Sequence, residues 1–411
     1  MTKQPLFGQR LRELRRERGL SQAALAGEQI STGYLSRLES GARQPTDRVV
    51  AYLAARLELA PTEFDTPASE GPLARALSIA ASSPSEEAAE DLVSALRGSR
   101  HESPLLRWQA LWLASRHLRR QGRTQEEQSL LEELVDVADQ LGLAELRCRS
   151  WTRYAQCLLA AGHTVRALDT ATRAYELARD EELPVYDTGP ALLELTAAET
   201  EAGRLPDARA HADALVDLAA VGPGALRAEA LWSAATVRLR QGDHEGAVRC
   251  LEEAIETVDS HADLLLWVRL RLAGASLHLQ VTPARPDLAQ DYLRQVKAPL
   301  SLVGTPLVRQ ELLAVEARLA FQQGRYEDAR TTYDELGAQV LRLPYQDRIA
   351  LGVLDSRLLI LEGHEAQGVA RLRELGEQAG QALRLDLAAD VWRALAEALA
   401  DLPATGRRAA S

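Results

Sequence analysis

The chain has 411 residues, of which 46% are hydrophobic, and it carries a formal net charge of −11. This hydrophobic content is enough for more than one buried core and excludes an intrinsically disordered chain. No apolar run is long enough to span a bilayer and no signal segment opens the chain, so we expect a cytoplasmic protein that does not enter a membrane.

The first 60 residues differ in charge from the rest of the chain. They contain ten Lys or Arg and six Asp or Glu, a formal charge of +4, whereas the other 351 residues carry −15. Because DNA repels an acidic surface, the basic first segment is the part of the chain suited to phosphate contacts. We expect Arg43 and Arg48 to add to these contacts.

Residues 10–45 have the spacing of three short helices. Leu11 and Leu14 lie one turn apart and give the first helix an apolar face. Gly19 is expected to end this helix, because glycine tolerates a positive φ at a helix C-terminus. Ser21 is expected to cap a second helix through its side-chain oxygen.

A turn at residues 27–30 is predicted to separate the second helix from a third. Leu25 and Ala26 bury the second helix, and Ser31 caps the third. The inner face of the third helix holds Leu35 and Leu38, and its outward positions are Thr32, Gly33, Ser36 and Arg37. These outward positions are the candidates for contacts outside the domain.

Residues 6–64 resemble the lambda-repressor-like (Xre) helix-turn-helix family through SQxxLA, YLSRLESG and Pro45. In that family the third helix lies in the major groove, and the start of the second helix holds the phosphate backbone. The resemblance implies Arg37 as the main base reader, since a guanidinium can pair bidentately with guanine. The full set of expected DNA contacts is Gln22, Ser31, Thr32, Gly33, Tyr34, Ser36, Arg37 and Arg43.

The same resemblance implies an ion pair between Arg15 and Glu39 that ties the first helix to the end of the third. The segment LAGEQIS departs from the family, because it is one residue shorter than the usual LAxxxGVS turn. Gln29 stands where the turn glycine is expected, which affects the angle between the two helices. The alternative, a small helical bundle without a role on nucleic acid, is disfavoured by the joint match of all three motifs.

A repeat follows a predicted linker at residues 65–72. Glycines that close long amphipathic segments are spaced by 40, 41, 39, 82 and 39 residues, and the long interval is two periods with one glycine lost near Pro283. These glycines are Gly122, Gly162, Gly203, Gly242, Gly324 and Gly363. The spacing indicates seven units of about 40 residues.

Small residues recur on both sides of these glycines. The position seven before each glycine holds Ser115, Ala155, Thr196, Ala235, Ala317 and Ser356. The position five after holds Ala167, Ala208, Ala247, Ala329 and Gly368, with Glu127 as the exception. Small side chains at both points are needed where two helices approach closely.

The pattern predicts an all-α chain: a five-helix DNA-binding head at residues 1–64 and an α-solenoid of about seven helical hairpins at residues 73–411. The hairpins resemble tetratricopeptide repeats with longer helices, although HEAT-like pairs have a similar length. Residues 384–401 read as a final helix that covers the last repeat.

In such a solenoid, one face of each first helix lines a concave groove. In the register set by the glycines, the groove positions include Gln109, Trp112, Arg116, Arg149, Gln156, Trp232, Thr236, Arg318 and Arg357. The recurring arginines could bind an anionic ligand, with tryptophans as apolar walls. The alternative is structural: arginines pair with neighbouring carboxylates, and tryptophans fill gaps between hairpins.

The joined head and body resemble the RRNPP regulators, cytoplasmic receptors whose repeat groove binds a short signalling peptide, as in quorum sensing. Groove asparagines clamp the peptide backbone in that family, and this chain has no Asn. Gln109, Gln156 or Gln322 could substitute, and a small anionic molecule remains open. The resemblance implies a homodimer on a palindromic DNA operator. The alternative function is a protein-interaction scaffold, or an antitoxin-like regulator whose repeats bind a partner protein.

We expect no enzymatic activity, metal or cofactor. The sequence lacks the GxxxxGK[ST] loop of ATPases and the GxSxG and HExxH motifs of hydrolases. Cys148, Cys157 and Cys250 are too few and too scattered for a disulfide framework or a zinc site. They are expected to be buried or half-buried thiols.

Overall fold

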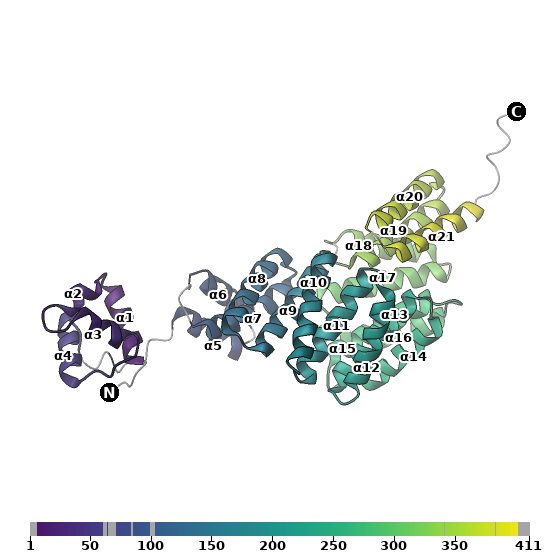
Figure 1. Ribbon diagram of the computed structural model, residues 1–411. Helices are drawn as coiled ribbons and strands as arrows, with labels where there is room; N and C mark the ends of the chain where they lie inside the picture. The colour runs from purple at the N-terminus through teal and green to yellow at the C-terminus, as the bar shows by residue number, and fades with distance from the viewer. Residues whose placement is uncertain are drawn as a thin grey trace. The chain divides into compact units, whose positions relative to one another are not determined.

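The computed structural model describes residues 6–60, 64, 71–83, 85–98, 103–340, 342–382 and 384–401. These residues form 21 helices and contain no strand, which confirms the all-α prediction (Figure 1). The chain divides into two compact units, Met1–Leu113 and Ala114–Ser411. No helix in the described ranges is both long enough and apolar enough to cross a membrane.

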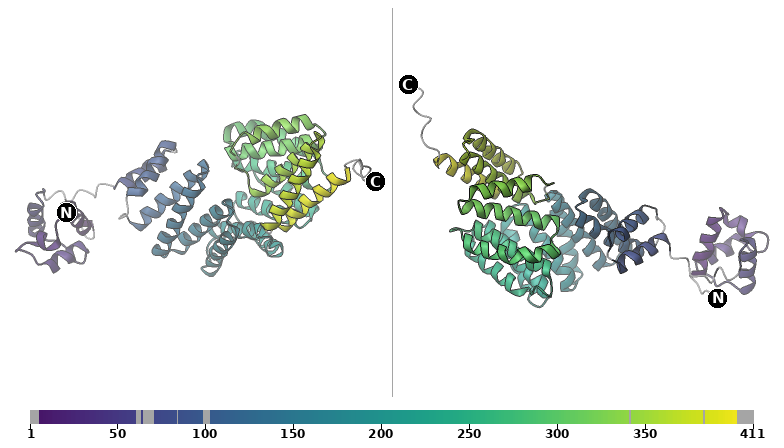
Figure 2. Two further views of the ribbon diagram at one scale, coloured as in Figure 1. Left: turned by 90° about the horizontal axis from the view of Figure 1, so that it is seen from above. Right: turned by 180° about the vertical axis from the view of Figure 1, so that it is seen from behind.

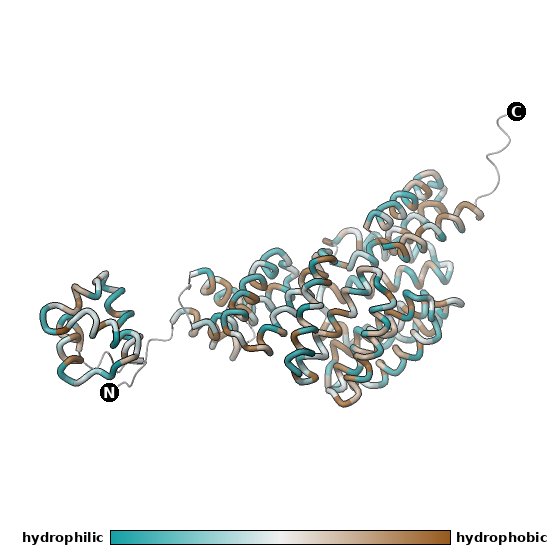
Figure 3. Tube along the Cα trace, in the orientation of Figure 1, coloured by the Kyte–Doolittle hydropathy of each residue, from teal (hydrophilic) through white to brown (hydrophobic). Residues whose placement is uncertain are grey.

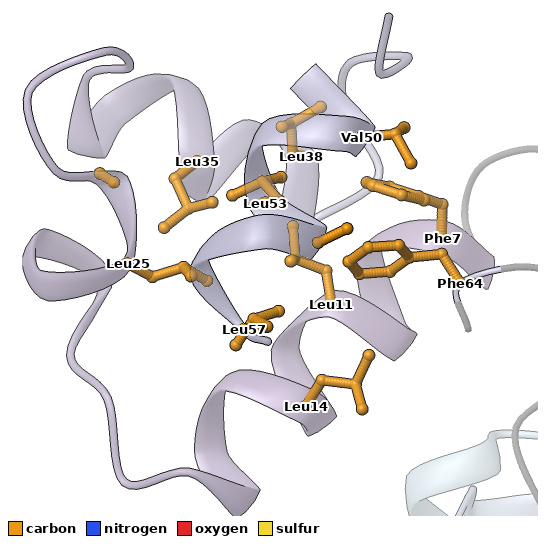
Figure 4. Packing of buried hydrophobic residues seen from close by; sticks show 12 residues of the cluster. Phe7, Leu11, Leu14, Leu25, Leu35, Leu38, Val50, Leu53, Leu57 and Phe64 are labelled. Atoms are coloured by element: carbon orange, nitrogen blue, oxygen red, sulfur yellow. The ribbon is translucent and has the colours of Figure 1, made fainter. Parts of the chain in front are cut away.

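The head contains α1 (Leu6–Glu17), α2 (Gln22–Ala26), α3 (Thr32–Glu39) and α4 (Asp47–Arg56). They enclose one core of leucines, in which the ring centroids of Phe7 and Phe64 lie 5.1 Å apart (Figure 4). A fifth head helix would follow α4, and residues 61–63 lie outside the described part of the chain. So do residues 65–70 of the predicted linker.

The predicted caps of the head are confirmed. Gly19 follows α1 with a φ of +66°. The Ser21 side chain accepts a hydrogen bond from the amide of Ala24, and the Ser31 side chain accepts one from the amide of Tyr34, each at 3.1 Å. Each serine thereby satisfies an amide at its helix N-terminus that has no partner within the helix.

The predicted turn at residues 27–30 is confirmed, and Gly27, two positions before Gln29, supplies a glycine at its start. Gly27 has φ +58° and ψ −146°, a conformation that glycine alone adopts readily, and it ends α2 after five residues. A Cβ on Gly27 would lie 2.5 Å from the hydroxyl oxygen of Tyr52. That hydroxyl donates to the carbonyl of Ala26 at 2.9 Å, and Arg56 donates to the carbonyl of Ala24. Helix α4 thus closes the C-terminus of α2 over the glycine.

Gly27→Ala should therefore lower the free energy of unfolding of the head by about 1–3 kcal/mol, because it combines a strained φ with a steric clash. Gly33→Ala is the matched control. A Cβ there meets nothing within 4 Å and the position is helical, so the change should be neutral or stabilise by up to ~1 kcal/mol. Hydrogen exchange at residues 6–57 measures both, and equal protection in the two variants would contradict the role of Gly27.

The remaining helices follow one another as pairs joined by turns, and α21 stands last. The pairs are α5 (Pro72–Ser82) with α6 (Glu86–Gly98), α7 (Pro104–Gln121) with α8 (Thr124–Leu141), α9 (Ala144–Ala160) with α10 (Thr164–Asp180), α11 (Val185–Glu201) with α12 (Leu205–Ala219), α13 (Gly224–Arg240) with α14 (His244–Thr257), α15 (Leu264–Gln280) with α16 (Pro286–Val303), α17 (Pro306–Gln322) with α18 (Tyr326–Gly337), and α19 (Tyr345–Leu361) with α20 (Glu365–Gln381). The predicted terminal helix is α21 (Leu385–Asp401). One pair, α5 with α6, precedes the seven that the period predicts.

Six of the turns within these pairs share one geometry. Each turn glycine has a φ between +70° and +90°. The residue after each glycine donates its backbone amide to the carbonyl five residues earlier in the chain, at 2.8–3.0 Å. Examples are Arg123 to Leu118 and His364 to Leu359. This is the Schellman motif, which satisfies the last carbonyls of the first helix and reverses the chain. The turn from α15 to α16 lacks a glycine, as predicted near Pro283.

The two columns of small residues are buried and mark where paired helices approach. All residues of both columns are buried. A Cβ on Gly368 of α20 would lie 2.5 Å from the carbonyl oxygen of Ser356 in α19, so the two columns face each other there. In the second unit, successive hairpins stack in chain order (Figure 2). The three cysteines are unbridged and buried or half-buried, as expected.

Candidate nucleic-acid interface and ligand cavity

Helix α3 presents its outward residues to solvent. Thr32, Ser36 and Arg37 are exposed, as is Gly33, while the leucines on the opposite face are fully buried. Tyr34 is half-buried against the core, and the guanidinium carbon of Arg43 lies 4.9 Å from the centre of its ring. The expected base-contacting side chains therefore lie on one free face of a short, capped helix.

Glu39 connects α1, α2 and α3. Arg15 donates to its two carboxylate oxygens at 2.6 and 3.0 Å, and the amide nitrogen of Gln22 donates to it at 2.8 Å. Burial alone would raise the pKa of Glu39, but the hydrogen bonds from Arg15 and Gln22 outweigh it and hold the pKa below its ordinary value. The predicted pair of Arg15 and Glu39 is present. Gln22 has a second amide hydrogen left for a phosphate oxygen.

A cavity of about 570 Å³ lies in the second unit. Its walls come from α13, α15, α17 and α19, with α21 at one side. It brings together Trp232, Thr236, Arg318 and Arg357, four of the predicted ligand residues, which are spread over 126 positions of the sequence. Gln322, a candidate substitute for the missing asparagines, also lines it.

The cavity wall carries charges of both signs. The guanidinium carbon of Arg269 lies 4.9 Å from the centre of the Trp232 ring. Arg318 donates to the hydroxyl of Ser276 at 3.2 Å, and in the described chain no carboxylate comes within 4.0 Å of its nitrogens. Burial lowers the pKa of Arg318, and burial raises the pKa of Glu311 to about 7 against the attraction of Arg269. The wall thus holds charges that are incompletely neutralised within the protein.

Ion pairs tie α21 to the middle of the solenoid beside the cavity. Arg240 of α13 donates to Asp386 at 2.6 Å and to the carbonyl of Thr200 at 2.5 Å. Arg384 donates to Glu201 at the end of α11. The Arg240–Asp386 and Arg384–Glu201 pairs join residues 146 and 183 positions apart in the sequence, and only 10% of either arginine side chain is exposed. They fix where α21 stands against α11 and α13.

Five predicted ligand residues do not line this cavity. Gln109 and Arg116 are exposed, and Trp112 stacks on Trp108 with ring centroids 5.3 Å apart. Arg149 donates to Asp187 at 2.5 Å, and Gln156 accepts from Arg119 at 2.7 Å. Arg149 and Gln156 thus follow the structural alternative, in which groove side chains pair with their neighbours. Arg357 does so too, because it donates to Glu397 of α21 although it lines the cavity.

Sequence reasoning missed several cavity residues, and for those of α15 and α21 the reason is identifiable. They are Arg269 and Ser276 of α15, Glu311 of α17, and Asp347 of α19, together with Arg384, Asp386 and Asp390 at α21. Helix α15 has no turn glycine to set its register, and α21 stands outside the repeat. Counting back six positions from the missing glycine near residue 282 would have found Ser276.

Gln156 belongs to a buried polar pair outside the cavity. It hydrogen-bonds Glu194 of α11, which is 7% exposed. Burial raises the pKa of Glu194 to about 7, against the attraction of Arg119 and the hydrogen bond from Gln156. The folded state therefore holds a proton that the unfolded chain releases between about pH 4.5 and 7, and stability falls as the pH rises through that window.

Glu194→Gln should remove this penalty. At pH 8 the variant should be more stable than the parent by about 1–3 kcal/mol, and near pH 4.5 the difference should vanish. Urea denaturation at both pH values measures it. Glu176→Gln, at an exposed site of α10, is the matched control and should show no such pH dependence. If the free energy of unfolding of Glu194→Gln differs from that of the parent by the same amount at both pH values, the buried charge of Glu194 is not its cause.

Comparisons with known proteins agree with the predicted fold of both parts of the chain. Residues 6–66 match the family model of a helix-turn-helix domain. A search of curated proteins gives no match to this sequence.

Solved structures similar in fold cover nearly the whole chain. The Rap conjugation gene regulator of plasmid pLS20, in complex with the Phr* peptide, is 14% identical with a TM-score of 0.55, covering 93% of this chain and 96% of that one. A Rap protein complexed with competence and sporulation factor is 12% identical with a TM-score of 0.54, covering 96% and 97%. Aspartyl phosphate phosphatase F from Bacillus subtilis is 13% identical with a TM-score of 0.53, covering 94% and 96%. At these identities the likeness concerns the fold.

The resemblance inferred from the sequence is thus confirmed for both halves at the level of architecture. Residues 6–66 are a helix-turn-helix domain, and the helices that follow form a tetratricopeptide-like solenoid. The chain thus combines a helix-turn-helix domain with a solenoid of helical hairpins whose fold is similar to that of these solved structures.

Proposed function

We propose that the protein is a DNA-binding transcription regulator of the cytoplasm whose repeat cavity binds a signalling ligand and thereby controls operator binding. The cavity carries this proposal. Its volume of about 570 Å³ is within the range of small-ligand sites, and Trp232, Thr236, Arg318 and Arg357 converge on it from three helices. The exposed face of α3 in the head is the proposed DNA-binding surface whose activity the bound ligand would control.

The wall chemistry supports a ligand with an anionic group, either a short peptide or a small molecule. Arg318 is held by a serine hydroxyl and not by a carboxylate, so its charge is available to an anion. The Trp232 ring supplies an apolar surface in the same cavity. The amide of Gln322 donates to the carbonyl of Leu279 at 2.8 Å, which leaves its side-chain oxygen to accept from a peptide N–H.

Control of DNA binding would follow from the position of the cavity between α13 and α21. A ligand that contacts both helices favours one separation of these helices, and it shifts the conformational equilibrium by its difference in affinity for the two states. One head reads a short half-site. We therefore propose a homodimer on a palindromic operator, in which a change in the solenoid alters the spacing of the two heads.

Arg37→Ala should abolish sequence-specific DNA binding and leave folding intact, because a bidentate contact to guanine contributes about 1–3 kcal/mol of discrimination. DNA selection with the full-length protein at moderate salt measures this. Arg179→Ala, an equal change of charge on exposed α10, is the control. An inverted repeat that is enriched equally by both variants would eliminate α3 as the reading helix.

Arg318→Ala combined with Arg357→Ala should abolish retention of the ligand without changing basal DNA affinity. Native mass spectrometry of protein purified from its host measures retention. Arg348→Ala is the control, because Arg348 is exposed on α19 and does not line the cavity. A small bound species that survives in the double variant would refute the arginine site. A partner protein that copurifies in stoichiometric amount, instead of a small bound species, would favour the scaffold or antitoxin-like alternative.

A further inference from the structure

The cavity wall is ordered in layers that run across its helices. Helices α13, α15, α17 and α19 each contribute one residue to what we call the polar row: Thr236, Ser276, Arg318 and Arg357. Four positions earlier on the same helices lies the apolar band, which consists of Trp232, Leu272, Ala314 and Val353. Residues four apart lie on the same side of a helix, about 6 Å apart along its axis, so row and band run side by side. Apolar and polar stretches alternate along the helices of the second unit (Figure 3).

The apolar band offers mainly aliphatic surface. Leu272 is 4% exposed and Ala314 7%, although both line the cavity. Two further aliphatic residues of the wall extend the band, Val315 and Leu354. The guanidinium of Arg269 covers one face of the Trp232 ring. An aliphatic ligand therefore fits the band, because burial of apolar surface on both sides favours association.

Of the two arginines in the polar row, only Arg318 lacks an ion pair among the described residues. Arg357 donates to Glu397 of α21, whereas Arg318 donates to the hydroxyl of Ser276. Burial lowers the pKa of Arg318 against the attraction of Asp347. A desolvated cation thus borders the apolar band, and a carboxylate placed there would supply the charge-assisted hydrogen bonds that Arg318 does not have within the protein.

The carboxyl groups on the other side of the band are weaker sites for a charged ligand. Glu311 precedes the band by three positions on α17, and Asp347 precedes it by six on α19. Burial raises the pKa of Glu311 to about 7 and also raises the pKa of Asp347. Near neutral pH Glu311 is partly protonated, whereas Arg318 keeps its charge, so the wall holds an anion in preference to a cation.

Most neutral polar side chains of the wall already form hydrogen bonds within the protein. Gln280 donates to the carbonyl and the hydroxyl of Ser276, at 3.1 and 2.9 Å. Gln322 donates to the carbonyl of Leu279 at 2.8 Å, and Thr236 donates to a carbonyl of its own helix. A bound peptide brings an N–H and a C=O with each residue, and each of these groups that is buried without a partner costs free energy. An aliphatic chain brings none.

We propose that the cavity binds a small aliphatic acid, with its carboxylate on Arg318 and its chain along the apolar band. A guanidinium donates two parallel hydrogen bonds to a carboxylate, which fixes the head of the ligand. This assignment names the ligand class that the proposed function leaves open. It rests on the proposed function in taking the cavity as the ligand site.

Thermal unfolding of the full-length protein tests the assignment with three probes of equal chain length. These are decanoate, 1-decanol and decylamine, each at about 0.1 mM. Decanoate should raise the Tm of the repeat domain by about 2–4 °C, because it binds the folded state through both Arg318 and the band. Decanol has the chain without the charge and should give a clearly smaller shift. Decylamine has the opposite charge and should give none.

Two variants separate the head group from the chain. Arg318→Gln should respond to decanoate no more than to decanol, and its unliganded Tm should stay close to that of the parent, because no ion pair is lost. Ala314→Leu fills the band and should respond to neither probe. Arg348→Gln is the matched control, exposed on α19 and outside the cavity, and should respond as the parent does.

A parent that does not respond to decanoate, or responds equally to decanol or decylamine, would overturn the proposal. So would an Arg318→Gln variant with the full decanoate shift. A pentapeptide of alternating alanine and leucine that raises the Tm more than decanoate does would overturn it as well. These measurements contain no DNA. Failure of DNA selection with an intact decanoate shift would therefore count against the proposed control of operator binding alone.

Discussion

The close approach of paired helices at small side chains is the constraint on which the rest of the solenoid depends. A glycine with positive φ closes each of six turns, and the residues seven before and five after it are buried. In the last pair a Cβ on Gly368 would meet the carbonyl oxygen of Ser356, so a larger side chain there would change the rotation of α19 about its axis. That rotation decides which side chains enter the cavity. In α19, Arg357 directly follows Ser356 and lines the cavity.

Charge has a different role in the two parts of the chain. In the head, buried Glu39 is satisfied by Arg15 and Gln22, and these three residues connect α1, α2 and α3 while Arg37 of α3 stays in solvent. In the cavity, Arg318 and Glu311 are desolvated, and among the described residues neither forms an ion pair within 4.0 Å. Incomplete neutralisation of this kind is costly in the empty protein and favours a charged ligand.

The ion pairs between α21 and the middle of the solenoid border the cavity. Asp386 at the start of α21 accepts a hydrogen bond from Arg240 of α13, and both residues line the cavity. Under the proposed function, a ligand that changes this contact would shift α21, and α21 would be the element with two positions that control of DNA binding requires.

Much of this organisation could be predicted from the sequence, because it is encoded in local spacing. The caps Ser21 and Ser31, the 40-residue period and the small columns all depend on residues within one or two helices of each other. Four cavity residues followed from the period alone. The turn at residues 27–30 was predicted too, whereas its closure by Tyr52 and Arg56 of α4 is visible only in the tertiary structure. The positions of Arg269 and Asp386 were decided by the tertiary structure. The curvature that brings residues more than 140 positions apart into contact accumulates over many repeats, and no local pattern records it.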